Sequence, residues 1–227
     1  MDLLSAEHLA VLAITAVAAV ALAGAARAGG QAGWVEVASR ALALALLASY
    51  LALWTVDLAR GDIGARSDLP LDLSDVVVFV AAYALWRPSP LAFELTYFWA
   101  FTATVQALAT PDLDQGFPGH RWWWFVIAHA GVVVAALLLA WGRQRTPRPG
   151  AVRRAFVASL IVAGAAALVD LALGANYMFL RRAPTDASLI DVMGPWPWYI
   201  AAGAALALAL FWLLDQPFRQ RRSMGRP

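Results

Sequence analysis

Apolar residues in this chain gather into seven long runs, and shorter polar connections separate them. Each run is about 20 residues long, which is the length of a helix that crosses a bilayer. Short connections place consecutive helices antiparallel and side by side. The pattern predicts an all-α membrane protein, a bundle of about seven transmembrane helices in one domain over residues 1–227. The runs cover residues 8–26, 35–58, 69–86, 91–110, 120–141, 153–174 and 195–217.

The ends of these runs carry arginines unevenly. All 17 basic residues are arginine, and five of them share one side of the predicted bundle: Arg60, Arg66, Arg121, Arg181 and Arg182. The other 12 of the 17 lie on the opposite side. Because cytoplasmic loops carry the excess of basic residues, this split predicts a cytoplasmic C-terminus and an N-terminus outside. No basic segment precedes the first run, so we expect a retained helix and not a signal peptide.

The amino-acid composition excludes several classes of protein and of functional site. Hydrophobic residues make up 62% of the chain, whereas soluble domains are about 45–50% apolar. The absence of cysteine excludes disulfides, thiolate metal sites and a cysteine nucleophile, and the absence of lysine excludes a Schiff base. We therefore expect no metal and no cofactor. Because the arginines lie at the ends of spans, we attribute the basic balance to membrane topology and expect no nucleic-acid partner.

One imidazole lies deep inside a predicted span. His129 is about nine residues into the run that begins at His120, or roughly 13 Å along a helix. The other two histidines, His8 and His120, lie at the ends of runs. Polar side chains at that depth are costly and usually face a partner or a cavity. His129 is therefore either a packing residue bonded to a neighbouring carbonyl or hydroxyl, or a general base within the membrane.

Several polar residues share the predicted outer level with His129. We expect them to surround one outward-facing cavity, because tolerated polar residues would scatter over all depths. They are Asp72, Ser74 and Asp75 in the third run, Gln106 in the fourth, and Asp170 and Asn176 at the end of the sixth.

The stretch Leu69–Asp75, LPLDLSD, contains the candidate nucleophile. Ser74 either bonds back to a carbonyl one turn earlier or attacks an ester while His129 takes its proton. Asp72, in the first turns of the predicted helix, either interacts favourably with the helix dipole or orients the imidazole, and Asp68 is a candidate cap. Other candidates for orienting the imidazole are Asp75 and Asp170, and Gln106 and Asn176 are candidates for stabilising an oxyanion.

The segment from Asn176 to Ile200 is predicted to be an outer loop or a re-entrant hairpin, because three prolines interrupt it. Arg181 and Arg182 either hold a lipid phosphate or anchor the loop at the interface. Trp196 and Trp198 are typical of the headgroup level.

Three pieces of sequence resemble the YwaF-like bacterial integral membrane proteins: FELTYFWAFTATVQALATPDL, FVIAHAG and NYMFLRRAPTDASLIDVMGPWPWY. The resemblance covers nearly the whole chain and implies a multi-pass protein of the bacterial cytoplasmic (inner) membrane. It places Asp72 and Ser74 where the family motif LPLHLCD has His and Cys. It places His129 on the histidine of an F-x-x-H-G-like motif, although Ala130 separates it here from Gly131.

Eukaryotic proteins similar in fold suggest an activity for the family. One is a phospholipid acyltransferase with a Cys/His pair, and others are androgen-induced-gene hydrolases of fatty-acid esters with a Thr/His pair. The resemblance thus implies a lipid acyl hydrolase or acyltransferase that uses Ser74 and His129, with membrane lipid as substrate. The alternatives are a proton-coupled small-molecule transporter, with Asp72, Asp75, His129 and Asp170 as a relay, and a non-catalytic membrane scaffold.

Overall fold

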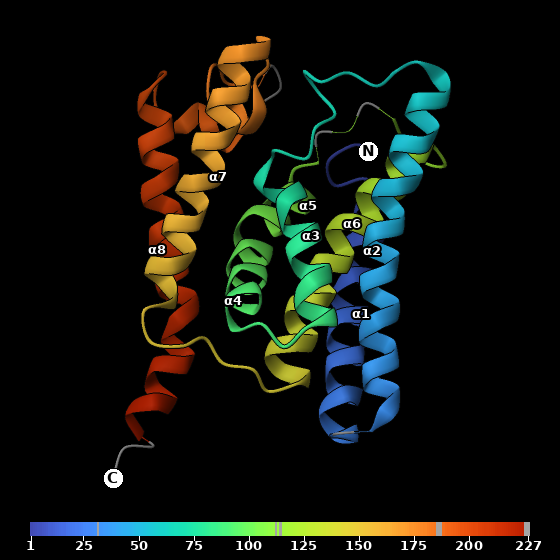
Figure 1. Ribbon diagram of the computed structural model, residues 1–227, viewed down its shortest axis with the longest axis vertical. Coiled ribbons are helices and arrows are strands. Elements are labelled where there is room, and N and C mark those ends of the chain that lie inside the picture. The colour runs from blue at the N-terminus through green and yellow to red at the C-terminus, as the bar shows by residue number, and fades with distance from the viewer. Residues whose placement is uncertain (31, 112, 114, 185–187, 225–227) are drawn as a thin grey trace. The chain divides into compact units, whose positions relative to one another are not determined.

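The computed structural model describes residues 1–30, 32–111, 113, 115–184 and 188–224, with the side chains described up to residue 220. The described part folds into helices and contains no strand, which confirms the predicted all-α class (Figure 1). The α-helices are α1 (Ala6–Gly29), α2 (Gly33–Arg60), α3 (Leu73–Trp86), α4 (Pro90–Trp99), α5 (Val105–Ala109), α6 (His120–Leu137), α7 (Ala151–Leu173) and α8 (Trp198–Met224). Two π-helical segments, η1 (Ala100–Thr104) and η2 (Leu138–Gly142), continue α4 and α6, and η3 (Tyr177–Phe179) and η4 (Leu189–Val192) are short 3₁₀ helices.

Five of these helices are long and apolar enough to cross a membrane: Ala6–Gly29, Gly33–Arg60, His120–Gly142, Ala151–Leu173 and Trp198–Gln220. The chain is therefore a multi-pass membrane protein. The remaining two predicted runs are also helical, but α3 has only 14 residues and the fourth run is divided by η1. The orientation of the termini stays a prediction.

The third helix begins four residues later than its apolar run. Residues 69–72 lie outside α3, so Asp72 precedes the helix instead of occupying its first turns. The backbone N–H of Leu69 donates to the hydroxyl of Tyr177, and that of Met178 donates to the carboxylate of Asp72. Asp68 accepts from Gly64 N at 2.7 Å and from Ser67 Oγ at 2.9 Å, and both bonds fix a turn. These long-range and turn contacts stabilise the non-helical start that the apolar pattern did not predict.

Contacts divide the chain into two compact units. Unit 1 comprises residues 1–63 and 74–145, and unit 2 comprises residues 64–73 and 146 onward. The prediction of one domain over residues 1–227 stays a prediction.

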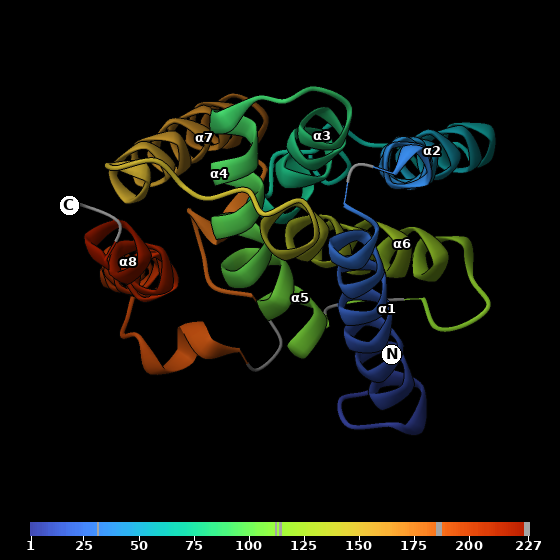
Figure 2. The same cartoon turned by 90° about the horizontal axis from the view of Figure 1, so that it is seen from below.

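Unit 1 is built around α6. This helix packs on α1, on α2 and on the α4–η1–α5 segment, as Figure 2 shows from below. Small residues allow the close approach of α6 to α2, since a Cβ atom added at Gly131 would lie 2.8 Å from Leu46 Cδ2. Large aromatic side chains fill the α4 side of the core, with Trp99 and Phe98 fully buried. The middle of α6 is thus enclosed by protein.

The start of α1 is tied to the ends of two other helices in unit 1. His8 is buried, its Nε2 donates to the carbonyl of Leu108 at 2.8 Å, and its Nδ1 accepts from the N–H of Leu4 at 3.0 Å. Trp122 Nε1 donates to the carboxylate of Glu7. Because an N–H can only donate to Nδ1, these contacts require the neutral Nε2–H form of His8.

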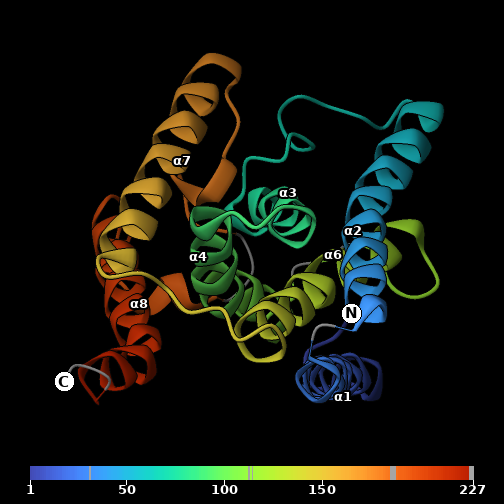
Figure 3. The same cartoon turned by 60° about the horizontal axis from the view of Figure 1, so that its bottom comes forward.

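Unit 2 contains α7 and α8, which lie side by side (Figure 3). A small core forms from Ala166, Ala175 and Tyr177, with the last two in the connection after α7. The Tyr177 hydroxyl accepts from Leu69 N and donates to the carbonyl of Ala65, each at 3.0 Å. The connection after α7 is therefore fastened to the segment that precedes α3.

Candidate functional site

His129 occupies the enclosed middle of α6. Its side chain is buried, and Nδ1 donates to the carbonyl of Phe125 at 2.9 Å. This is the carbonyl contact that the packing interpretation anticipated. The same contact places the proton on Nδ1 of the neutral ring, so Nε2 carries a lone pair. Within the described part of the chain, no residue donates a hydrogen bond to Nε2.

Aromatic rings form a wall beside His129. Phe125 stacks on the imidazole with ring centroids 4.3 Å apart, and Trp124 meets it edge-on at 6.0 Å. Trp124 also meets Tyr50 of α2 at 5.5 Å, and Tyr50 meets Phe79 of α3 at 4.9 Å. The wall links α2, α3 and α6, and it excludes water from one side of the imidazole.

Ser74 lies in the first turn of α3, in the same unit as His129 and five residues before Phe79 of the aromatic wall. The first turn of a helix has backbone N–H groups without intrahelical partners, and they favour negative charge. No hydrogen bond joins Ser74 to His129 in this structure, and the catalytic roles of both stay a prediction. Asp75 is half-buried beside Ser74 in the same turn.

The two residues predicted to stabilise an oxyanion use their amides locally. Gln106 Nε2 donates to Thr110 Oγ1 at 2.9 Å. Asn176 accepts the N–H groups of Arg181 and Arg182 and donates to the carbonyl of Arg182, so it closes the loop after α7. Both amides thus bond to neighbours in their own segments, and the oxyanion role of each stays a prediction.

Unit 1 contains buried donors that have no acceptor among the described residues, and two of them concern α6 and its neighbour η1. They are Trp124 Nε1, next to the His129 ring, and Thr104 Oγ1, at the end of η1. The η1 segment packs on α6. A buried donor without an acceptor costs about 1–3 kcal/mol, and single π-helical turns are frequent at functional sites. Neither donor can be recognised as unpaired from the sequence, because burial without a partner leaves no local pattern.

Asp72 and Asp170 lie together in unit 2, around the connection after α7. Asp170 Oδ1 accepts from Tyr177 N at 2.8 Å, and Asp72 Oδ1 accepts from the next N–H, that of Met178, at 2.6 Å. Asp170 is fully buried, and its Oδ2 has no donor in the described structure. Burial raises the pKa of the Asp72 carboxyl, the Met178 hydrogen bond lowers it, and the charge of Asp170 raises it further. These two carboxylates belong to unit 2, whereas Ser74 and His129 belong to unit 1, so the predicted single cavity stays a prediction.

A cavity of about 590 Å³ opens in the loop region of unit 2. Arg181, Arg182, Trp196 and Tyr199 line it. Arg181 Nη1 bonds to the carbonyl of Asp170 at 3.2 Å, and Trp196 Nε1 bonds to that of Leu180 at 3.0 Å, so backbone contacts position both side chains. Trp198, the fourth predicted headgroup residue, is 69% exposed and does not line this cavity.

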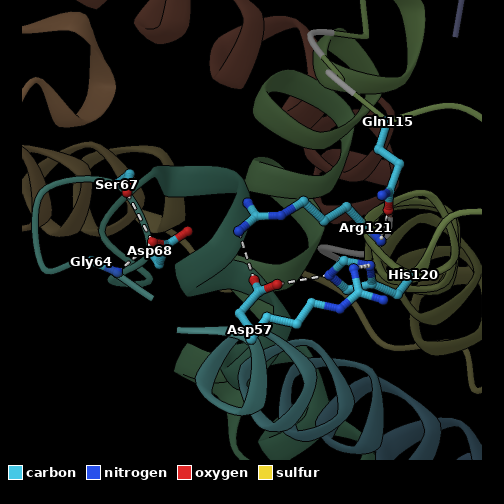
Figure 4. A network of polar contacts seen from close by, with 8 residues as sticks. Asp57, Gly64, Ser67, Asp68, Gln115, His120 and Arg121 are labelled. Carbon is cyan, nitrogen blue, oxygen red and sulfur yellow. Dashed lines mark hydrogen bonds and ion pairs between the residues drawn. The ribbon is translucent and has the colours of Figure 1, made fainter. Parts of the chain in front are cut away.

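Unit 1 also contains an ionic cluster that the sequence did not predict. Asp57, near the end of α2, is fully buried and accepts from His120 Nε2 and from Arg121 Nη2, both at 2.7 Å (Figure 4). Arg60 Nη1 lies 3.3 Å from His120 Nδ1. Because arginine only donates, this contact requires a lone pair on Nδ1 and a neutral ring. The sequence does show an acid, Asp57, within the apolar run at residues 35–58. Its partners could not be identified from the sequence, because they are 63 and 64 residues away.

Comparison with known proteins places the chain in a family. The model of the TMEM164 family matches residues 3–215, and this range includes every predicted site residue. The chain belongs to the TMEM164 family. It is 28% identical over 157 residues to an uncharacterized protein of Treponema pallidum (strain Nichols). That match covers 68% of this chain and 63% of the relative, so the chain spans less than two thirds of its length. No solved structure matches the chain.

Proposed function

We propose that this TMEM164-family membrane protein is a lipid acyl hydrolase or acyltransferase that acts within the membrane. Ser74 is the nucleophile and His129 is the general base. We further propose that it is a YwaF-like member of the bacterial cytoplasmic membrane and that its substrate is a membrane lipid ester.

The observation that carries the proposal is the state of His129. Burial and the bond from Nδ1 to the Phe125 carbonyl hold one neutral form of the ring, which leaves the Nε2 lone pair for a proton. In serine–histidine catalysis the base needs this arrangement, in which one nitrogen is anchored and the other is free.

The position of Ser74 supports its role as the nucleophile. It lies in the first turn of α3, where free backbone N–H groups favour a developing alkoxide. No hydrogen bond joins the two side chains in this structure, and catalytic contacts often tighten only in the complex, so the proposal requires substrate binding to bring them within reach. Trp124 Nε1 and Thr104 Oγ1 are the candidate donors to the ester oxygen, since both are buried and have no acceptor within the described part of the chain.

The proposed reaction has two steps. Ser74 Oγ attacks the acyl carbon while its proton moves to His129 Nε2. The imidazolium then gives this proton to the departing alcohol, and an acyl-serine remains. Water in a hydrolase, or an acceptor alcohol in a transferase, loses a proton to Nε2 and attacks the acyl-serine. The serine leaves with that proton, so the enzyme is regenerated.

Turnover of fluorescent fatty-acid esters and phospholipids by the purified protein in lipid nanodiscs tests the proposal. We expect Ser74→Ala and His129→Gln to lower kcat/KM at least about a thousandfold, and the double variant to lose no more than either single one. Ser49→Ala is the matched control, because Ser49 also lies in a helix of unit 1 but its hydroxyl is buried and bonds to the carbonyl of Leu46. We expect Ser74→Cys to retain or raise activity, since a thiol is the stronger nucleophile. Turnover that survives both single variants would rule out this pair.

A second candidate function is proton-coupled transport, and Asp170 is the observation that favours it. Asp170 is fully buried beside Asp72, its Oδ2 has no donor among the described residues, and acids buried in this way are typical of the relays of proton-coupled transporters. Proton flux into liposomes that requires Asp170, without ester turnover, would favour this function over the esterase.

A further inference from the structure

A polar cavity of about 520 Å³ lies at the other end of unit 1 from the ionic cluster of Asp57, where α1 turns into α2 and α6 ends in η2. Its volume falls within the roughly 300–1,000 Å³ that is typical of small-molecule sites. Its lining includes Gly33 and Glu36 of α2 and the segment from Gly142 to Arg145. None of these residues has a role in the proposed ester chemistry.

Positive charge exceeds negative charge around this cavity. The Glu36 carboxylate is shared by two guanidinium groups, with Arg40 Nε at 2.9 Å and Arg143 Nη2 at 2.6 Å. Arg145 has no carboxylate within ion-pair distance in the described structure, and its Nη1 reaches only the carbonyl of Ala84, at 3.4 Å. Three guanidinium groups therefore surround one carboxylate.

The donors of these arginines are not all used. Arg143 Nε is buried without an acceptor among the described residues, and Arg145 is half-buried. Burial lowers the pKa of Arg145, the charge of Arg143 lowers it further, and Glu36 opposes both. Buried charges in proteins are normally paired. The arrangement of these side chains would thus stabilise an anion in the cavity.

We propose that this cavity binds a phosphate-bearing anion through Arg143 and Arg145. The planar guanidinium fork matches the oxygen spacing of a phosphate, and it forms charge-assisted hydrogen bonds with that group. The cavity lies at the end of the helices that carries most of the arginines, the predicted cytoplasmic side, where lipid phosphates are found. The phosphate belongs either to the headgroup of an anionic lipid or to a free ion, and both sources share this chemistry.

Two pairs of variants isolate the site. Arg145→Gln removes the cavity guanidinium that has no carboxylate partner among the described residues. Arg87→Gln is its control, because Arg87 is exposed and does not line the cavity. Gly33→Asp places a carboxylate at the cavity, and Gly33→Asn is the uncharged control of nearly equal size. A Cβ atom at Gly33 meets nothing within 4 Å, and an acid at the start of α2 is favourable, so Gly33→Asp is expected to fold.

Binding is measured on the full-length protein in neutral detergent. The probes are short-chain phosphatidylglycerol and, separately, inorganic phosphate, each titrated against thermal stability, with native mass spectrometry to count retained lipid. We expect saturable binding of at least one probe. Affinity should fall about tenfold or more in Arg145→Gln and Gly33→Asp, and change less than about twofold in Arg87→Gln and Gly33→Asn.

The outcomes identify the source of the phosphate or refute the site. Retention of phosphatidylglycerol alone identifies a lipid headgroup, and binding of inorganic phosphate with the same variant dependence identifies a free anion. If Arg145→Gln fails to fold, the comparison of Gly33→Asp with Gly33→Asn decides. Absence of saturable binding of both probes, or equal affinities in each test variant and its control, would overturn the proposal. Because these experiments measure binding and not ester turnover, failure of the anion-binding proposal can be distinguished from failure of the proposed function.

Discussion

Asp57 connects the end of α2 to the start of α6, and its removal is expected to destabilise unit 1. In Asp57→Ala two hydrogen bonds of 2.7 Å are lost, one from His120 and one from Arg121. Breaking a fully buried ion pair costs about 3–5 kcal/mol. Here the carboxylate is fully buried, but the side chain of Arg121 is 34% exposed and can regain water. We therefore expect the free energy of unfolding to fall by about 2–4 kcal/mol.

Asp57→Asn removes the negative charge of the side chain and nearly keeps its shape. Its amide oxygen can still accept one of the two hydrogen bonds, so the loss should be about half as large, roughly 1–2 kcal/mol. Unfolding is followed by helical circular dichroism in mixed micelles of increasing sodium dodecyl sulfate content. Asp62→Asn is the matched control, because Asp62 is exposed just after α2 and should change stability by less than about 0.5 kcal/mol. Equal stabilities of Asp57→Ala and Asp62→Asn would refute the role of the carboxylate.

Three further predictions concern packing and ionisation. Because the pKa of Asp72 is raised in the folded protein, its ionisation costs more there than in the unfolded chain, so stability should fall as pH rises from about 4 through the folded pKa. Asp72→Asn should remove that fall, and thermal unfolding of both proteins from pH 4 to 8 measures it. The same dependence of stability on pH in both proteins would contradict a raised pKa for Asp72. Gly131→Ala should lower the free energy of unfolding by about 1–3 kcal/mol, since its Cβ would lie 2.8 Å from Leu46. Gly164→Ala in α7 is the control, because its Cβ would meet nothing within 4 Å and the change should be neutral or stabilising. Unfolding in mixed micelles measures both. Tyr177→Phe removes a hydroxyl that makes two hydrogen bonds and should speed proteolysis of the connection before α3; unchanged cleavage rates would exclude this fastening role.

The helices were predictable because apolar run length is a local property. The seven runs all became helices, and a depth estimate within one run was enough to predict the burial of His129. The start of α3 was not predictable in this way. Residues 69–72 are held outside the helix by Tyr177 and Met178, which lie more than a hundred residues later in the chain.

The site was only partly predictable for the same reason. A single deep imidazole stands out in the sequence, but the use of the Gln106 and Asn176 amides by their neighbours depends on side-chain geometry. The donors of Trp124 and Thr104 stand out only once burial and missing partners are known. The pairing of Asp57 with His120 likewise required the packing of α2 on α6.

The most direct test of the central claim is the site of covalent labelling by a fluorophosphonate. The intact protein in lipid nanodiscs is treated with the probe, digested, and analysed by mass spectrometry for the modified residue. The proposed mechanism predicts a single adduct on Ser74 whose formation slows at least about a hundredfold in His129→Gln, because an unassisted serine is a weak nucleophile. An adduct on another residue, or labelling of Ser74 at an unchanged rate in His129→Gln, would contradict it.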